Sequence, residues 1–365
     1  MKGEQFKKRI GALKRSLSTW GVEALLISSP PNVFYLTGLK ASLAFVLILE
    51  EGEFLLTDAR YFEKARKVAP PEMKLELITD DSNSFLKRTI ASLKIKRVGF
   101  ESDKVSCDTY RSLKSSKYSL LGISHPLQKL RMIKDNEERA TMKKAIEITD
   151  KIYYELLNNL DNQSELTLRG KIIDLAFKFS AQGEAFSSIV ALGENSAIPH
   201  WESSKVVIEK GKPLLLDFGV IYGGYCSDFT RTLYLGKPPS DFKKYYEYVK
   251  SAWFKGFEKV KVGTPVWEID KTIREYFHEK GVLSRFTHST GHGIGIEVHE
   301  FPRIYFKRRA SFLKKQPLIE EGMVFTIEPG LYFEGRFGIR LENIVFVEGG
   351  EGRTYSKVPM ELLSL

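Results

Sequence analysis

Cysteine is nearly absent from this sequence. The 365 residues contain only Cys107 and Cys226, whereas small secreted domains are commonly stapled by several disulfides. Two thiols far apart in the chain exclude such a framework and favour a reducing compartment, so we expect a cytoplasmic protein. The N-terminal residues MKGEQFKKRIGALKRSL contain none of the apolar segment that defines a secretory signal, which agrees with this expectation.

Long apolar runs are also absent. No stretch approaches the ~20 apolar residues that a membrane-spanning helix needs, so we expect no membrane partner. The net charge of +10 is carried by Lys and Arg residues that are spread along the chain. Proteins that bind single-stranded nucleic acid interleave basic with aromatic residues, and the sequence has no such segment. We therefore expect a basic, solvated surface and no nucleic-acid partner.

The composition is that of an ordinary globular protein, 42% hydrophobic and 28% charged, in a chain long enough for two domains. In residues 1–126 the predicted helices and strands alternate, which is typical of an α/β domain. The turn signal Glu51-Gly52 predicts a hairpin of the strands beside it. We expect helices at 1–20, 60–68 and 82–94, strands at 24–29, 43–50, 53–56, 74–78 and 97–100, and a β-like segment or turn at 32–38.

Residues 127–365 are predicted to form a second, larger domain. Asp135 or Asn136 begins a helix that runs to about residue 160, because apolar residues recur there at helical spacing. We expect further helices at 165–182, 240–260 and 265–280, a hairpin at 213–235, and strands after the last helix. Two helices and a hairpin are thus followed by two helices and more strands, and the predicted fold class is α+β.

The hairpin carries the first two functional candidates. Gly223-Gly224 suits the two-residue turn that matches the twist of the strands. Asp217 and Asp228 then lie diagonally on one face, with Cβ atoms roughly 7–8 Å apart, and two carboxylates at that separation can hold one cation. Gly219 has no side chain, so we expect it to leave room for that cation. The predicted register pairs Tyr222 with Tyr225, Ile221 with Cys226, Phe218 with Phe229, and Asp217 with Thr230.

Three further candidates lie in distinctive strings: His292 in GHGIGIEVHE, Glu328 in IEPG and Glu342 in GIRLEN. Together with DFG and SDFTRT around the two aspartates, these strings resemble the pita-bread metallopeptidase family, which includes methionine aminopeptidase, aminopeptidase P, prolidase and the metal-free relative creatinase. The resemblance is greatest to the proline-specific branch and covers about residues 130–355; a weaker resemblance to the N-terminal domain of prolidase and aminopeptidase P covers the rest. It implies a C-terminal pita-bread domain, a duplicated αββ unit with the metals between its halves.

The resemblance implies that Asp217 binds one metal ion, that His292 and Glu328 bind another, and that Asp228 and Glu342 bridge the two. Charge supports this implication, because four carboxylates facing one imidazole repel one another and two divalent cations cancel their charge. Oxygen ligands with a single His and no Cys favour Mn²⁺ or Co²⁺, with Zn²⁺ as the alternative.

The implied reaction is peptide hydrolysis. Two such ions polarise the scissile carbonyl and hold a bridging hydroxide that attacks it, while Glu328 handles the proton. His200 and His299 match positions that line the substrate site in the proline-specific members, where they would serve both catalysis and substrate binding.

Two other residues have roles that the sequence leaves open. Arg340 lies two residues before Glu342 and on the same strand face, so it would pair with a ligand carboxylate or bind the substrate. His288 lies four residues before His292. It would either support the metal ligands or have no role in the site.

The sequence thus predicts a metallo-exopeptidase that cleaves the bond between an N-terminal residue and a following proline, as an aminopeptidase or as a dipeptidase. Small peptides with proline at the second position are the expected partners, and the resemblance implies a homodimer. One alternative is a non-catalytic peptide-binding protein on the same fold, but such relatives typically lose ligands. A methionine aminopeptidase would leave residues 1–126 unexplained, and a creatinase-like hydrolase would lack the metal set that is complete here.

Overall fold

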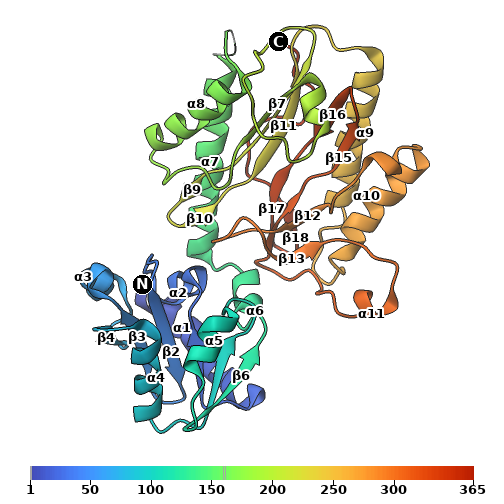
Figure 1. The fold of residues 1–365 in the computed structure, drawn as a ribbon. Coiled ribbons are helices and arrows are strands. Elements are labelled where there is room, and N and C mark those ends of the chain that lie inside the picture. The colour runs from blue at the N-terminus through green and yellow to red at the C-terminus, as the bar shows by residue number, and fades with distance from the viewer. Residues whose placement is uncertain (1, 159, 161) are drawn as a thin grey trace. The chain divides into compact units, whose positions relative to one another are not determined.

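The computed structural model describes residues 2–158, 160 and 162–365 (Figure 1). Its contacts divide the chain into two compact units, residues 1–130 and 131–365. The boundary that the sequence predicts, between residues 126 and 127, stays a prediction. Among the described residues, no helix combines the length and the apolar character that crossing a bilayer requires.

The first unit is built on a six-stranded mixed sheet in the order β4-β3-β2-β1-β5-β6. Leu26, Leu47, Leu56 and Val98 from its strands form a core with apolar residues of α4. This arrangement confirms the expected α/β organisation and the hairpin of β2 and β3. The elements are α1 (Lys2–Trp20), β1 (Ala24–Ile27), α2 (Pro30–Thr37), β2 (Ala44–Leu49), β3 (Glu53–Thr57), α3 (Ala59–Val68), β4 (Lys74–Leu77), α4 (Ser82–Ser92), β5 (Arg97–Glu101), α5 (Cys107–Leu113) and β6 (Ser119–Ile123), before α6 (Gln128–Met132).

The prediction of a β-like segment at 32–38 is wrong, because α2 occupies these residues. Pro30 and Pro31 fill its first turn, where a missing N–H has no cost. The buried carboxylate of Glu101 takes the place of a cap and accepts from Ser28 N (2.6 Å) and Ser29 N (2.9 Å). An anion at a helix N-terminus is also favoured by the helix dipole. The local sequence favoured an extended segment or a turn, whereas these residues form a helix that follows the two N–H groups bonded to Glu101.

The second unit contains two sets of helices and strands. Its elements are α7 (Asn136–Leu157), α8 (Glu165–Lys178), β7 (Ile189–Leu192), η1 (Gly193–Ala197), β8 (Pro213–Phe218), β9 (Ile221–Tyr222), β10 (Tyr225–Cys226), β11 (Phe229–Tyr234), α9 (Ser240–Phe257), α10 (Trp267–Glu279), η2 (Leu283–Arg285), β12 (Gly291–Gly293), β13 (Glu300–Ile304), α11 (Ala310–Leu313), β14 (Val324–Ile327), β15 (Gly330–Phe333), β16 (Phe337–Arg340), β17 (Asn343–Glu348) and β18 (Glu351–Arg353). The expected helices and their order are confirmed.

Each set of helices packs on its own sheet. Apolar residues of α7 and α8, such as Ile152 and Leu168, pack against the sheet β11-β8-β7. Those of α9 and α10, such as Val249 and Ile273, pack against strands of the sheet β13-β12-β14-β17-β18. Figure 1 shows the strands of this unit between the two helix pairs. The functional candidates lie on these strands or in the segments that join them.

The predicted hairpin register is confirmed. Phe218 pairs with Phe229, Asp217 with Thr230, and Tyr222 with Tyr225. Gly223 and Gly224 have φ values of 56° and 90°, the positive values that this turn needs.

Gly219 is required for a reason that the sequence did not predict. A Cβ atom on Gly219 would lie 1.9 Å from the carbonyl oxygen of Ser227. The glycine is therefore needed because the two chains of the hairpin approach closely, and its role in leaving room for a cation stays a prediction.

Candidate metal centre

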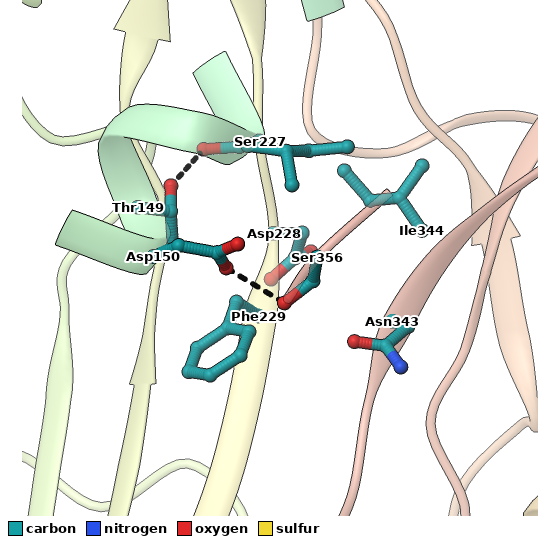
Figure 2. A pocket seen from close by; sticks show the side chains of 9 residues that line it. Thr149, Asp150, Ser227, Asp228, Phe229, Asn343, Ile344 and Ser356 are labelled. Atoms are coloured by element: carbon teal, nitrogen blue, oxygen red, sulfur yellow. Dashed lines mark hydrogen bonds between the residues drawn. The ribbon is translucent and has the colours of Figure 1, made fainter. Parts of the chain in front are cut away.

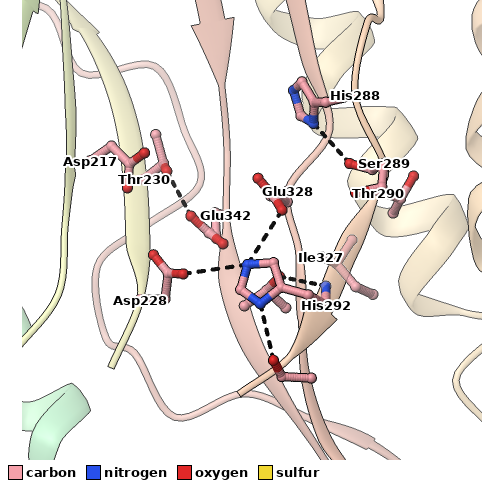
Figure 3. A network of polar contacts seen from close by, with 12 residues as sticks. Asp217, Asp228, Thr230, His288, Ser289, Thr290, His292, Ile327, Glu328 and Glu342 are labelled. Atoms are coloured by element: carbon pink, nitrogen blue, oxygen red, sulfur yellow. Dashed lines mark hydrogen bonds and ion pairs between the residues drawn. The ribbon is translucent and has the colours of Figure 1, made fainter. Parts of the chain in front are cut away.

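The five predicted ligands converge from both halves of the second unit (Figure 3). Asp217 lies near the end of β8 and Asp228 directly before β11, whereas His292 is the middle residue of β12. Glu328 directly follows β14, and Glu342 lies between β16 and β17. A β-bridge between Thr230 and Glu342 joins the two sheets, so the pairing of the sheets brings the two groups of ligands together.

The ligand atoms are close enough to share cations. His292 Nε2 lies 3.6 Å from Asp228 Oδ2 and 3.6 Å from Glu328 Oε1. One ligand atom each of Asp228, His292 and Glu342 lies within 4.8 Å of the others, and all three residues are buried. Thr230 Oγ1 donates to Glu342 Oε2 at 2.7 Å, which fixes the orientation of this carboxylate.

The protein without metal stabilises the protonated forms of the carboxylates. Burial, followed by the charges of the neighbouring carboxylates, raises the pKa of Asp228 and that of Glu328 well above their ordinary values. The same two causes raise the pKa of Glu342 to about 8. Burial also lowers the pKa of His292 to about 4, so its imidazole is neutral at neutral pH and keeps a lone pair for a metal.

Two buried oxygen atoms show that the site fits cations. Asp217 Oδ1 and Glu342 Oε1 are buried and have no hydrogen-bond partner, an arrangement that is costly unless something else binds them. Oxygen-rich sites with one imidazole suit hard or borderline divalent ions. The donor set, the neutral imidazole and the unpartnered oxygens therefore fit divalent cations.

Raised carboxyl pKa values predict how the stability of the metal-free protein depends on pH. A carboxyl group whose pKa is higher in the folded state stabilises the fold at low pH and loses that contribution as pH rises. For Glu342 the window runs from its ordinary value of 4.5 to about 8. We therefore expect the melting temperature of the metal-free protein to fall across this range of pH. The melting temperature of the Mn²⁺-saturated protein should depend on pH differently. Calorimetry of both forms measures the two melting curves against pH, and the same dependence in both forms would contradict the prediction.

Arg340 anchors Asp217 from the side opposite its free oxygen. Its buried guanidinium forms an ion pair with Asp217 Oδ2. It also donates to Tyr332 Oη at 2.7 Å and to Thr230 Oγ1 at 3.3 Å. A cation held in this way fixes one carboxylate oxygen and leaves the other for a metal.

His288 belongs to the same network but does not contact His292. Its Nδ1 lies 2.8 Å from the carbonyl oxygen of Ser289, which can only accept, so Nδ1 carries the proton. Burial and the charge of Arg340 lower the pKa of His288 to about 3, and the neutral Nε2 accepts from Tyr332 Oη at 2.8 Å. Sequence reasoning missed Tyr332, although the hairpin of β15 and β16 offered the signal, since its register places Tyr332 near Arg340.

The two other predicted histidines face the same region. The ring of His299, an exposed residue, lies 4.3 Å from that of His292 in an edge-to-face arrangement. His200 is exposed, and the carbonyl oxygen of Pro199 before it accepts from Arg340 Nη1 at 3.3 Å. His299 therefore lies beside the His292 ring, and His200 follows a residue that is bonded to Arg340.

Sequence reasoning also missed the residue that holds the loop of His200. The buried carboxylate of Glu165, in the first turn of α8, accepts from Leu192 N (2.7 Å) and Trp201 Nε1 (2.9 Å). It also accepts from Asn195 Nδ2 (2.8 Å) and Ser204 Oγ (2.8 Å). Residues 192–204, which include His200, are therefore tied to the start of one helix.

Asp228 also borders a small pocket lined by α7, the hairpin and the C-terminal segment (Figure 2). There Thr149 Oγ1 and Ser227 Oγ lie 2.7 Å apart, and Asp150 accepts from Ser356 Oγ at 2.6 Å. Burial raises the pKa of Asp150. These bonds tie the residue before Asp228 to α7, so the hairpin is fixed beside its ligand.

The fold brings buried carboxylates and one imidazole of the second unit together in an arrangement that fits divalent cations. Residues 140–349 match metallopeptidase family M24, and residues 9–133 match the creatinase/prolidase N-terminal domain. The chain belongs to metallopeptidase family M24.

Several similar proteins can be aligned with nearly the whole of this chain. An uncharacterized peptidase of Bacillus subtilis is 33% identical, and the alignment covers 100% of both chains. The structure of Xaa-Pro dipeptidase from Bacillus anthracis has 31% identity and a TM-score of 0.93, covering 99% of this chain and 100% of that one. The structure of X-Pro aminopeptidase from Thermotoga maritima has 32% identity and a TM-score of 0.86, covering 96% and 100%. These likenesses confirm the predicted fold class, a pita-bread domain preceded by a smaller α/β domain.

Proposed function

We propose that this metallopeptidase cleaves the peptide bond between an N-terminal residue and a following proline, with two divalent metal ions bound by Asp217, Asp228, His292, Glu328 and Glu342. The convergence of these five residues, with two buried oxygens left free, is the observation that carries the proposal. The names of the two similar structures, a dipeptidase and an aminopeptidase for Xaa-Pro bonds, support the substrate class.

The protein supplies the groups around the reacting carbonyl. Bound divalent ions would polarise that carbonyl and lower the pKa of water. Glu328, whose pKa burial raises above its ordinary value, is suited to take up a proton and return it. His299 and His200 would donate hydrogen bonds to the substrate and stabilise the negative charge that develops on the carbonyl oxygen. Arg340 would bind substrate only through donors that its pairing with Asp217 and Tyr332 leaves available.

A panel of peptides tests the substrate class. With Mn²⁺ or Co²⁺ added, Xaa-Pro or Xaa-Pro-Xaa peptides should be hydrolysed at least about tenfold more efficiently than Xaa-Ala, a difference of about 1.4 kcal/mol in transition-state binding. The ratio of the hydrolysis rates of Xaa-Pro and Xaa-Pro-Xaa peptides distinguishes a dipeptidase from an aminopeptidase. Equal hydrolysis of Xaa-Ala would contradict proline specificity, and preferential cleavage after an N-terminal Met would indicate a methionine aminopeptidase. Peptide binding without any turnover would indicate a non-catalytic binding protein.

Replacing either substrate-side histidine should slow turnover without removing metal. His299→Ala and His200→Ala are each expected to reduce kcat by about 10²–10³-fold, the usual effect of one acid–base or oxyanion group. His278→Ala is a matched control, because His278 is exposed on α10. Metal content by elemental analysis decides the assignment, since stoichiometric loss of metal in either variant would make that histidine a ligand.

The assembly and location of the protein belong to the same proposal. We expect a cytoplasmic homodimer, with Mn²⁺ or Co²⁺ preferred over Zn²⁺. Neither Cys107, which is exposed, nor Cys226, which is buried, takes part in a disulfide, which supports a reducing compartment.

A further inference from the structure

A buried ionic cluster joins the start of the second unit to the loop that carries His299. The Lys134 ammonium, with 1% of its side chain exposed, lies 3.3 Å from Glu300 Oε2. Arg131 contacts Glu300 Oε1 and lies 2.8 Å from Glu297 Oε2. The backbone N–H of Glu297 donates to Glu300 Oε1 at 3.0 Å. The carboxylate of Glu300, with 5% of its side chain exposed, is thus held by two cations and one N–H.

The charges in this cluster compensate one another. Burial alone would raise the pKa of Glu300, but the charges of Lys134 and Arg131 outweigh it and hold the pKa below its ordinary value. Replacing a buried ion pair by apolar residues is often neutral for stability, whereas removing one partner is costly. Stability alone therefore does not explain why charges lie here.

Glu300 directly follows His299 in the chain and is the first residue of β13. The other end of the loop is fixed as well, because Cys226 N donates to Gly295 O at 2.7 Å. A Cβ atom on Gly295 would lie 2.9 Å from Glu300 Oε2, so the carboxylate also packs tightly against the loop. The loop between His292 and Glu300 is thereby held at both ends, with the ring of His299 over that of His292.

We propose that Glu300, held by Arg131 and Lys134, is a positioning residue that fixes the His299 imidazole over the metal centre. The inference rests on the proposed function, because that function gives His299 its role toward the substrate. Sequence reasoning gave Arg131 and Lys134 no role, and the structure shows that both contact Glu300, the residue after His299.

Neutralising the charge of Glu300 or that of Lys134 tests this inference. Glu300→Gln and Lys134→Met are each expected to reduce kcat by about 10–100-fold, because a displacement of ~1 Å costs that much in well-oriented sites. Both metal ions should stay bound, and KM should change by no more than about threefold. Glu348→Gln is the matched control: its carboxylate pairs with Lys143 of α7 at 3.0 Å and is 18% exposed, and turnover should stay unchanged. Full activity in both test variants would overturn the inference.

A double-mutant cycle separates positioning from general destabilisation. If Glu300 acts through His299, then Glu300→Gln should cause no further loss of kcat in a His299→Ala background. Losses that multiply would overturn the inference. Full activity in His299→Ala alone would instead contradict the role given to His299 under the proposed function.

Should Glu300→Gln fail to fold, Gly295→Ala provides the same test without a change of charge. Its added methyl group displaces the Glu300 carboxylate, and its effect on kcat should likewise vanish in the His299→Ala background. An effect that persists there would overturn the inference.

Discussion

Removing the metal ions is expected to abolish peptide hydrolysis, and adding Mn²⁺ or Co²⁺ to restore it. Without cations, the protonated forms of Asp228, Glu328 and Glu342 are favoured, since burial and mutual repulsion raise the pKa of each. The scissile carbonyl then loses several kcal/mol of electrostatic stabilisation, which corresponds to a fall of about 10³-fold or more in rate.

The measurement is hydrolysis of an Xaa-Pro peptide by protein whose metal content has been brought to zero and verified by elemental analysis. Titrating Mn²⁺, Co²⁺ and Zn²⁺ back separately then ranks the three ions. The control is circular dichroism of the same samples, which shows whether the metal-free chain stays folded. Undiminished activity in the verified metal-free protein would contradict a metal-dependent mechanism.

The second large effect is expected from the two aspartates of the hairpin. Asp228 is proposed to bridge both ions and Asp217 to bind one. Asp228→Asn should therefore weaken both metal sites and remove nearly all activity, by about 10³-fold or more, whereas Asp217→Asn should weaken one site and leave the other occupied. Asn is preferred to Ala because Arg340 pairs with Asp217, and Ala would leave a buried cation without its partner.

Metal content per chain at increasing Mn²⁺ concentration distinguishes the two variants. Asp217→Asn should bind its first ion with nearly the affinity of the unchanged protein, and Asp228→Asn should bind neither tightly. Asp150→Asn is a control from the same region, because Asp150 is buried near Asp228 and is assigned no metal. Identical metal loss in the two hairpin variants would contradict the bridging role of Asp228.

The hairpin shows how much local sequence decides. The two-residue Gly223-Gly224 turn fixes which residues face each other, and the alternation of side chains then places Asp217 and Asp228 on one face. The start of α7 was predictable for a similar reason, since Asp135 and Glu138 form a capping box within four residues. Such features involve neighbours in the chain, so the order of residues alone determines them.

Other features depend on residues that are far apart in the chain. The N–H groups of the two residues before α2 are bound by Glu101, more than 60 residues away, and the local signal from Pro30-Pro31 did not predict the helix. Gly219 is required by the carbonyl of Ser227, a contact that exists only once the hairpin has closed.

The support around the candidate site was likewise decided by tertiary structure. The sequence singled out the five metal ligands, His200, His299 and Arg340, because each lies in a distinctive local string. It gave no sign that Glu165 would hold the loop of His200 or that Lys134 would meet Glu300, 166 residues later in the chain. Buried charges are costly until a partner neutralises them, and which partner reaches them is determined by the packing of whole sheets and helices, not by the residues beside them in the sequence.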